Sequence, residues 1–284
     1  MNSSEPVTEH LTTPSGITVE FDLWGELERN AILLLHGGGQ TRHSWNATAE
    51  KLTRTGRCAI TMDLRGHGGS DWSSDGDYKL KDFSSDVAYL IEQLKINPAL
   101  VGASLGGLVG IYLEGSYKPS SISALVLVDI VPNINVAGAD RVKSFMLENS
   151  KTGFSSLSEV SEILSKYNPH RKKSSDLEGL KKNLRKRGDK WFWHWDPMFI
   201  STERDEENPD MRNPNLLNEL CKKISAPMLL VRGKLSDLVT ENEVEEFLKR
   251  YPHARFADVS GAGHMVVGDE NDAFAKAIIE FLNQ

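Results

Sequence analysis

A five-residue stretch, Gly102-Ala103-Ser104-Leu105-Gly106, constrains this chain more than any other feature. The apolar run Ala99–Val101 leads into it, and a run of small and apolar residues leads out of it. This order predicts a buried strand, a sharp turn and a helix. A serine raised above the end of a strand adopts a strained backbone, often with positive φ. Its neighbours two positions away must be small, and Gly102 and Gly106 meet that requirement.

The pentapeptide alone is a weak signal, because a turn of small residues explains it equally well. The residues around it favour a catalytic turn over a simple one. A strand before and a helix after the G-x-S-x-G pattern are typical of a nucleophile elbow. The amide of Leu105 then faces the same space as the Ser104 hydroxyl and can donate to an oxyanion. Candidate partners follow along the chain in the order Ser, Asp, His.

Short, mostly apolar runs predict strands that are covered on both faces. They lie at residues 31–35, 58–64, 99–101, 124–131 and 228–231. An apolar stripe between Phe83 and Leu94 predicts an amphipathic helix that stops before Pro98. Strands alternating with helices indicate a mostly parallel sheet with helices on both faces. In such sheets the functional loops lie beyond the carboxyl ends of the strands.

The pattern changes between Pro132 and Cys221, where buried strands give way to charged runs and helical stripes. Leu177, Leu180 and Leu184 have the spacing of one such stripe. We therefore predict a helical cap over residues 132–221. The core domain then consists of residues 1–131 and 222–284.

Composition narrows the class of protein. The 284 residues suit one α/β domain with an insertion, and the net charge of −7 argues against nucleic acid as a partner. The polar first ten residues lack the features of a signal peptide, and no apolar run is long enough to span a membrane. A cytoplasmic protein without a membrane partner is expected. Histidine and cysteine spacings match no metal site, so we predict no metal and no cofactor.

Ser104 requires a base and an orienting acid, because a serine hydroxyl is a poor nucleophile until an imidazole takes its proton. His264 follows the last strand, between small residues, and is the predicted base. Asp237 follows the strand that ends at Val231 and is the predicted acid. Two alternatives remain: Asp237 also suits a helix cap, and Asp129, which ends another strand, is a rival acid whose simpler interpretation is a polar turn residue.

The glycine-rich loop after Leu35 is the expected source of a second oxyanion donor. We predict the amide of Gly38 as the partner of the Leu105 amide, because glycine leaves a backbone amide accessible. Trp193 and Trp195 belong to a tryptophan-rich segment that either walls an apolar pocket or fastens the cap to the core. The predicted substrate-pocket residues are Gly39, His43, Trp193, Trp195 and Met265.

Four stretches together resemble the α/β-hydrolase fold. They are His36–Gln40, Asp63–Ser70, Gly102–Gly107 and Gly261–His264. The resemblance implies an eight-stranded sheet with a cap inserted after the sixth strand. It also implies the roles given above for Ser104, Asp237, His264 and the two oxyanion donors. The sequence looks most like the branch of small esterases and non-haem haloperoxidases.

The predicted function is that of a serine esterase acting on a small carboxylic ester, apolar or aromatic, through an acyl-enzyme. Three alternatives stay open. The same residues serve carbon–carbon bond hydrolysis in some relatives, cofactor-free oxygen chemistry in others, and small-molecule reception with residual hydrolysis in a third group. An aspartate at the elbow would indicate epoxide or haloalkane chemistry, and Ser104 disfavours it.

Overall fold

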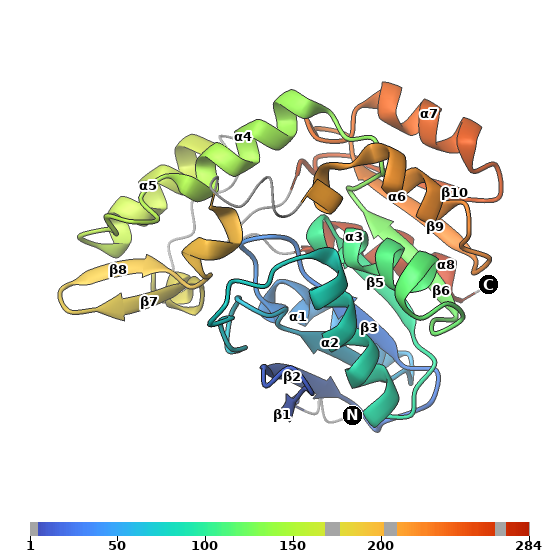
Figure 1. Ribbon diagram of the computed structural model, residues 1–284, viewed down its shortest axis with the longest axis horizontal. Coiled ribbons are helices and arrows are strands. Elements are labelled where there is room, and N and C mark those ends of the chain that lie inside the picture. Colours follow the sequence, from blue (N-terminus) through green and yellow to red (C-terminus); the bar gives the residue numbers. More distant parts are fainter. Residues whose placement is uncertain (1–4, 168–176, 202–208, 265–270, 284) are drawn as a thin grey trace.

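The computed structural model describes residues 5–167, 177–201, 209–264 and 271–283. Within these ranges the main sheet has eight strands in the order β1-β2-β4-β3-β5-β6-β9-β10 (Figure 1). These strands are β1 (Val7–Thr12), β2 (Thr18–Trp24), β3 (Ile32–Leu35), β4 (Ala59–Met62), β5 (Ala99–Ala103), β6 (Ala124–Val128), β9 (Met228–Gly233) and β10 (Arg255–Val259). The α-helices are α1 (Asn46–Arg54), α2 (Leu80–Gln93), α3 (Leu105–Tyr112), α4 (Val136–Leu147), α5 (Leu157–Tyr167), α6 (Pro214–Cys221), α7 (Glu241–Arg250) and α8 (Ala275–Leu282).

The sheet is mostly parallel. Strands β1 and β2 pair antiparallel, as do β2 and β4, and every other pair of neighbours is parallel. The predicted fold class is thus confirmed. Strand β1 was not expected, because its residues are almost all exposed and carry no buried face that a hydrophobic pattern would reveal.

Helices cover the sheet on both faces. On β3, Ile32 and Leu34 face a core that includes residues of α1 and α8, while Leu33 and Leu35 face a core that includes residues of α2, α3, α6 and α7. Because successive side chains of a strand point to opposite faces, a central strand with both faces covered is apolar at every position. This explains the unbroken apolar run of β3, which is wholly buried.

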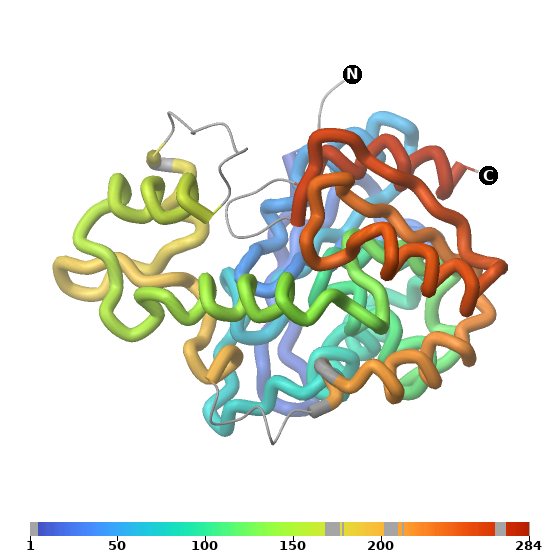
Figure 2. Tube along the Cα trace, turned by 90° about the horizontal axis from the view of Figure 1, so that it is seen from above, coloured from blue at the N-terminus to red at the C-terminus, as the bar shows by residue number. Residues whose placement is uncertain are grey.

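Part of the chain between β6 and β9 forms a cap with a hydrophobic cluster of its own, and Figure 2 shows α4 running from the core into this separate lobe. Helix α6, in the same stretch, packs into the core of the main domain instead. The cap is less helical than predicted. The expected stripe over Leu177–Leu184 is instead the 3-10 helix η3 (Glu178–Asn183), followed by a hairpin of β7 (Leu184–Arg187) and β8 (Lys190–Trp193). Aromatic residues in Trp191–Trp193 favour a strand, and their pairing with β7 outweighs the leucine spacing.

No helix in the described ranges is both long enough and apolar enough to cross a bilayer.

Candidate active site

Ser104 stands at the turn between β5 and α3 with φ 45° and ψ −110°. This positive φ is unusual for a residue with a side chain and stores strain of about 1–3 kcal/mol. The turn is closed by close backbone approaches. A Cβ atom on Gly102 would overlap the carbonyl carbon of Gly106, and one on Gly106 would lie 2.6 Å from the carbonyl oxygen of Leu35. Both glycines are therefore required by packing, as the motif predicted.

His264 lies beyond β10 and lines the same cavity as Ser104. Its Nδ1 atom lies 2.6 Å from Oδ2 of Asp129, and both side chains are about 5% exposed. A carboxylate accepts a hydrogen bond, so Nδ1 carries the proton in this contact. The other ring nitrogen, Nε2, is then left as the basic atom of the neutral imidazole.

Asp129 is held at the carboxyl end of β6 by contacts with the β9 loop. Its Oδ2 atom accepts a hydrogen bond from the Ser236 hydroxyl at 2.8 Å, and its Oδ1 accepts one from the Gly233 amide at 3.3 Å. Its own amide donates to the carbonyl of Val231 at 2.7 Å. The residue has a positive φ of 53°. These contacts fix the carboxylate in the orientation that meets His264.

Asp237, the predicted acid, does not contact His264 in this structure. Its carboxylate pairs with Arg141 of α4 at 2.6 Å, and the Asp237 side chain is 38% exposed. The loop after β9 carries Asp237 toward the cap, where its backbone packs against Gly138. Asp129 comes directly after β6, so no loop carries it away from the edge of the sheet. The prediction for Asp237 therefore fails on geometry, and the alternative residue, Asp129, is the partner of His264.

Gly38 and Leu105, the predicted oxyanion donors, both line the cavity with Ser104. In the described part of the chain their amides donate to no other group. The loop after β3 is firmly held: the Gly37 amide donates to Gln40 Oε1 at 3.0 Å, and the Gly106 amide of α3 donates to the carbonyl of His36 at 3.2 Å. Both predicted donor residues thus lie at the cavity that Ser104 lines, on a loop and a helix start that are held in place.

Three buried histidines support this region. The amide of Leu64 donates to Nε2 of His36, so Nδ1 of His36 donates to the Gly37 carbonyl at 2.7 Å. His194 of the cap accepts from the Gly68 amide at 2.8 Å and donates to the Gly39 carbonyl at 3.0 Å. The ring of His67 lies between them. Burial lowers the pKa of all three to about 3, so they are neutral.

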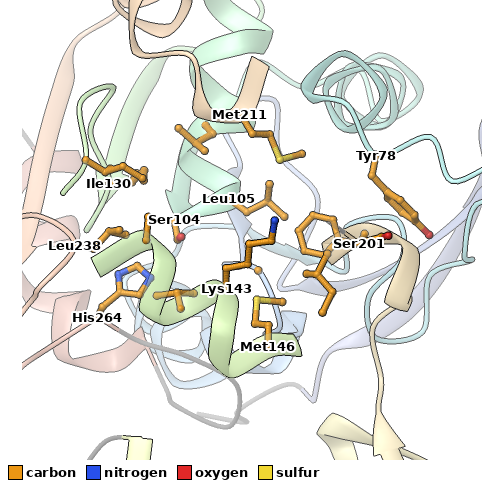
Figure 3. Close-up of a pocket in the computed structure, with 17 residues that line it drawn as sticks. Tyr78, Ser104, Leu105, Ile130, Lys143, Met146, Ser201, Met211, Leu238 and His264 are labelled. Atoms are coloured by element: carbon orange, nitrogen blue, oxygen red, sulfur yellow. The ribbon is translucent and has the colours of Figure 1, made fainter. Parts of the chain in front are cut away.

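The cavity at Ser104 has a volume of about 180 Å³ and mainly apolar walls (Figure 3). Its lining consists of Gly38, Tyr78, Ser104, Leu105, Leu108, Ile130, Ile134, Ala139, Val142, Lys143, Met146, Phe199, Ile200, Ser201, Met211, Leu238 and His264. Figure 3 shows the amine of Lys143 inside this ring of side chains. The Tyr78 hydroxyl already donates to Asp196 at 2.6 Å. The cavity thus brings together a hydroxyl, an imidazole and a lysine amine within a mainly apolar wall.

Most of the predicted substrate-pocket residues lie elsewhere. Trp193 and Trp195 are buried in the cap core, with their rings stacked 4.9 Å apart, and neither lines the cavity at Ser104. Gly39 is covered by Met146 and Trp195. His43 is half-buried and does not line the cavity. Met265 lies outside the described residues. Cap residues of α4 and the segment near Phe199 line the pocket instead, and their spacing gave no signal.

The two cysteines are buried free thiols. Burial raises the pKa of Cys58, and it raises that of Cys221 to about 12, so neither is a reactive thiolate at neutral pH. Among the described residues, His, Cys, Asp and Glu side chains form no group of three suited to a metal ion.

Comparison with known proteins decides the family. A family model described as the alpha/beta hydrolase fold matches residues 30–271. The chain belongs to the α/β-hydrolase fold family. This α/β hydrolase is 31% identical over 258 residues to an esterase of Mycobacterium tuberculosis, covering 88% of this chain and 80% of the relative. A crystal structure of that esterase superposes with a TM-score of 0.75 at 28% identity, covering 100% of this chain and 94% of the other.

Two further matches agree with the family. An sn-1-specific diacylglycerol lipase of Mus musculus is 27% identical over 273 residues, which is 91% of this chain and 82% of the relative. The structure of E-2-(acetamidomethylene)succinate hydrolase has a TM-score of 0.84 at 21% identity, covers 99% of this chain and 100% of the other, and supports the fold alone. With an esterase and a lipase among its sequence relatives, the predicted enzyme class of carboxylic ester hydrolase is confirmed.

Proposed function

We propose that this α/β hydrolase cleaves a small carboxylic ester through an acyl-enzyme, with Ser104 as nucleophile, His264 as base and Asp129 as the acid that orients the base. One observation carries the proposal: the His264–Asp129 hydrogen bond of 2.6 Å stands at the cavity that also holds the strained Ser104. A nucleophile, a base and a carboxylate behind the base are the arrangement that serine hydrolases use.

In the first step, Nε2 of His264 takes the proton of the Ser104 hydroxyl while its oxygen attacks the ester carbonyl. Asp129 accepts a hydrogen bond from Nδ1 of His264, which fixes the orientation of the ring, and it stabilises the imidazolium. The amides of Gly38 and Leu105 receive the negative charge on the carbonyl oxygen, and one such donor contributes roughly 3–4 kcal/mol. His264 then gives its proton to the leaving alcohol, and the acyl group stays on Ser104.

In the second step, His264 takes a proton from water, which attacks the acyl-enzyme. The same two amides stabilise the second oxyanion. Collapse of this intermediate returns the proton to Ser104 and releases the carboxylic acid. Neutral His36 and His194 hold the oxyanion loop without placing a positive charge that would compete with His264.

The cavity supports an apolar acyl group as substrate. Its apolar lining includes Leu105, Leu108, Ile130, Met146 and Phe199. Burial of apolar surface contributes about 25 cal/mol per Å², so binding here favours aliphatic or aromatic groups over polar ones. The Lys143 amine adds a preference for a substrate that carries a negative charge near the ester.

The test is covalent labelling followed by measurement of the mass of the intact protein. The enzyme is incubated with p-nitrophenyl butyrate and with an organophosphate. We expect turnover and one adduct, and Ser104→Ala should lose the adduct and lower kcat by about four to six orders of magnitude. Ser201→Ala is the matched control, since Ser201 lines the same cavity outside the elbow. An adduct that persists in Ser104→Ala would contradict the proposal.

A further inference from the structure

A second cavity of about 420 Å³ adjoins the one at Ser104. It lies between the carboxyl end of β6, the first turns of α4, and α6. Its lining consists of Leu108, Val131, Pro132, Asn133, Ile134, Val136, Ala139, Asp140, Met211, Pro214, Asn215, Leu217, Asn218 and Arg250. None of these residues was predicted to belong to a functional site, and none belongs to the proposed triad.

The two cavities share four lining residues. Leu108, Ile134, Ala139 and Met211 line both of them. They come from α3, the segment after β6, α4 and η6 (Pro209–Arg212) respectively. We call these four residues the neck. Because all four side chains are apolar, the neck offers no hydrogen bond to a polar group that crosses it.

We propose that the second cavity receives the far end of an aliphatic acyl chain, which crosses the neck while its ester carbonyl stands at Ser104. This inference rests on the proposed function. The direction follows from proton transfer: the leaving alcohol takes its proton from His264, so it lies on the His264 side. Figure 3 shows Met211 of the neck on the side of Ser104 away from His264. The acyl group of the ester therefore points toward the neck.

Two polar side chains of the second cavity, Asn133 and Asn218, are already engaged with each other. The Asn218 amide donates to Oδ1 of Asn133 at 2.7 Å and accepts from the hydroxyl of Tyr251 at 2.8 Å. Buried polar groups with satisfied partners add little for a new ligand. Asp140, Asn215 and Arg250 line the cavity as exposed residues, and the rest of the wall, with Leu217, Val131 and the neck residues, is apolar. This chemistry suits methylene groups.

The volumes of the two cavities set the expected preference for acyl-chain length. The second cavity has more than twice the volume of the first, about 420 Å³ against 180 Å³. A short acyl group would leave most of this apolar space unfilled. Each methylene that leaves water for an apolar site gains a free energy corresponding to about a fourfold rise in kcat/KM.

The experiment compares p-nitrophenyl acetate, butyrate, hexanoate and octanoate at one pH, so that only the acyl arm changes. We expect kcat/KM to rise about fourfold for each added methylene beyond butyrate, until the second cavity is filled. Equal kcat/KM for butyrate and octanoate would overturn the inference and leave the proposed function standing. Absence of any hydrolysis, together with no label on Ser104, would overturn the proposed function itself.

Ala139→Leu narrows the neck, and we expect the octanoate-to-butyrate ratio of kcat/KM to fall at least about tenfold. Met211→Ala widens it, and the ratio should hold or rise. Ala137→Leu is the matched control: Ala137 is exposed on the same helix and lines neither cavity. Equal ratios in the Ala139→Leu and Ala137→Leu variants would also overturn the inference.

Discussion

Asp129 and His264 lie 135 positions apart in the chain, and their side chains meet at 2.6 Å above the carboxyl ends of β6 and β10. Strand β9, which pairs with both, lies between them in the sheet. Its loop supplies the Ser236 hydroxyl and the Gly233 amide that hold the Asp129 carboxylate. The orientation of the base therefore depends on three separate loops at one edge of the sheet.

Replacing the carboxylate is the direct test of this pair. Asp129→Asn should lower kcat/KM for p-nitrophenyl butyrate by about four orders of magnitude, because the amide no longer stabilises the correct imidazole tautomer and the imidazolium. Asp237→Asn should cost about 0–1 kcal/mol of stability, through the loss of a partly exposed ion pair with Arg141, and little activity. A larger activity loss in Asp237→Asn than in Asp129→Asn would favour the acid predicted from the sequence.

The tight turn at Ser104 predicts that a side chain added at Gly106 would disturb the packing. A methyl group on Gly106 would lie 2.6 Å from the Leu35 carbonyl oxygen and 2.7 Å from its Cβ atom, so the backbone must shift. Gly106→Ala should cost about 1–3 kcal/mol of stability and lower the melting temperature by several degrees. Gly263→Ala is the control, since its nearest contact would be an ordinary 3.5 Å. Equal melting temperatures for the two variants would show that the turn relaxes without strain.

The buried histidines predict a loss of stability in acid. Burial lowers the pKa of His36, His67 and His194 from about 6.5 to about 3. Between these pH values the unfolded chain binds protons that the folded chain does not. Their contribution is complete above pH 6.5, and it falls by up to about 1.4 kcal/mol per pH unit for each group as the pH is lowered toward 3.

Urea unfolding at pH 7 and pH 5 measures this effect. In His67→Asn the decrease in unfolding free energy between these pH values should be about 2 kcal/mol smaller than in the parent protein. The substituted amide keeps a donor for the Arg65 carbonyl, which His67 contacts at 3.0 Å. An unchanged decrease would mean that His67 takes up no proton on unfolding in this range.

The cation on the cavity wall predicts a charge preference. Lys143 projects its amine among the side chains near Ser104 (Figure 3). Lys143→Met should lower kcat/KM for the p-nitrophenyl monoester of succinate by about tenfold relative to the neutral butyrate, a difference of about 1.4 kcal/mol. The effect should weaken at high salt. Arg141→Met, a change of charge on the same helix outside the cavity, should leave the ratio unaltered.

Local sequence patterns were sufficient to predict the central strands, helix α2 and the turn at Ser104. The apolar runs of β3, β4 and β6, the stripe of α2 and the glycines around Ser104 each depend on neighbours within a few positions, and the structure has them where the pattern predicts. Backbone periodicity and steric limits act over that range. Fold class and elbow could therefore be derived from residue order, and so could the presence of His264 beyond the last strand.

The choice of acid and the lining of the pocket depend on contacts between distant segments. Asp129 and Asp237 both follow strands that end at the same edge, and residue order does not distinguish them. Only the path of the loop after β9 brings Asp237 to Arg141 and leaves Asp129 facing His264. Likewise, Trp193 and Trp195 stack within the cap because the β7–β8 hairpin turns them inward. Such outcomes follow from packing free energies that many segments share, and a single stretch of sequence does not contain them.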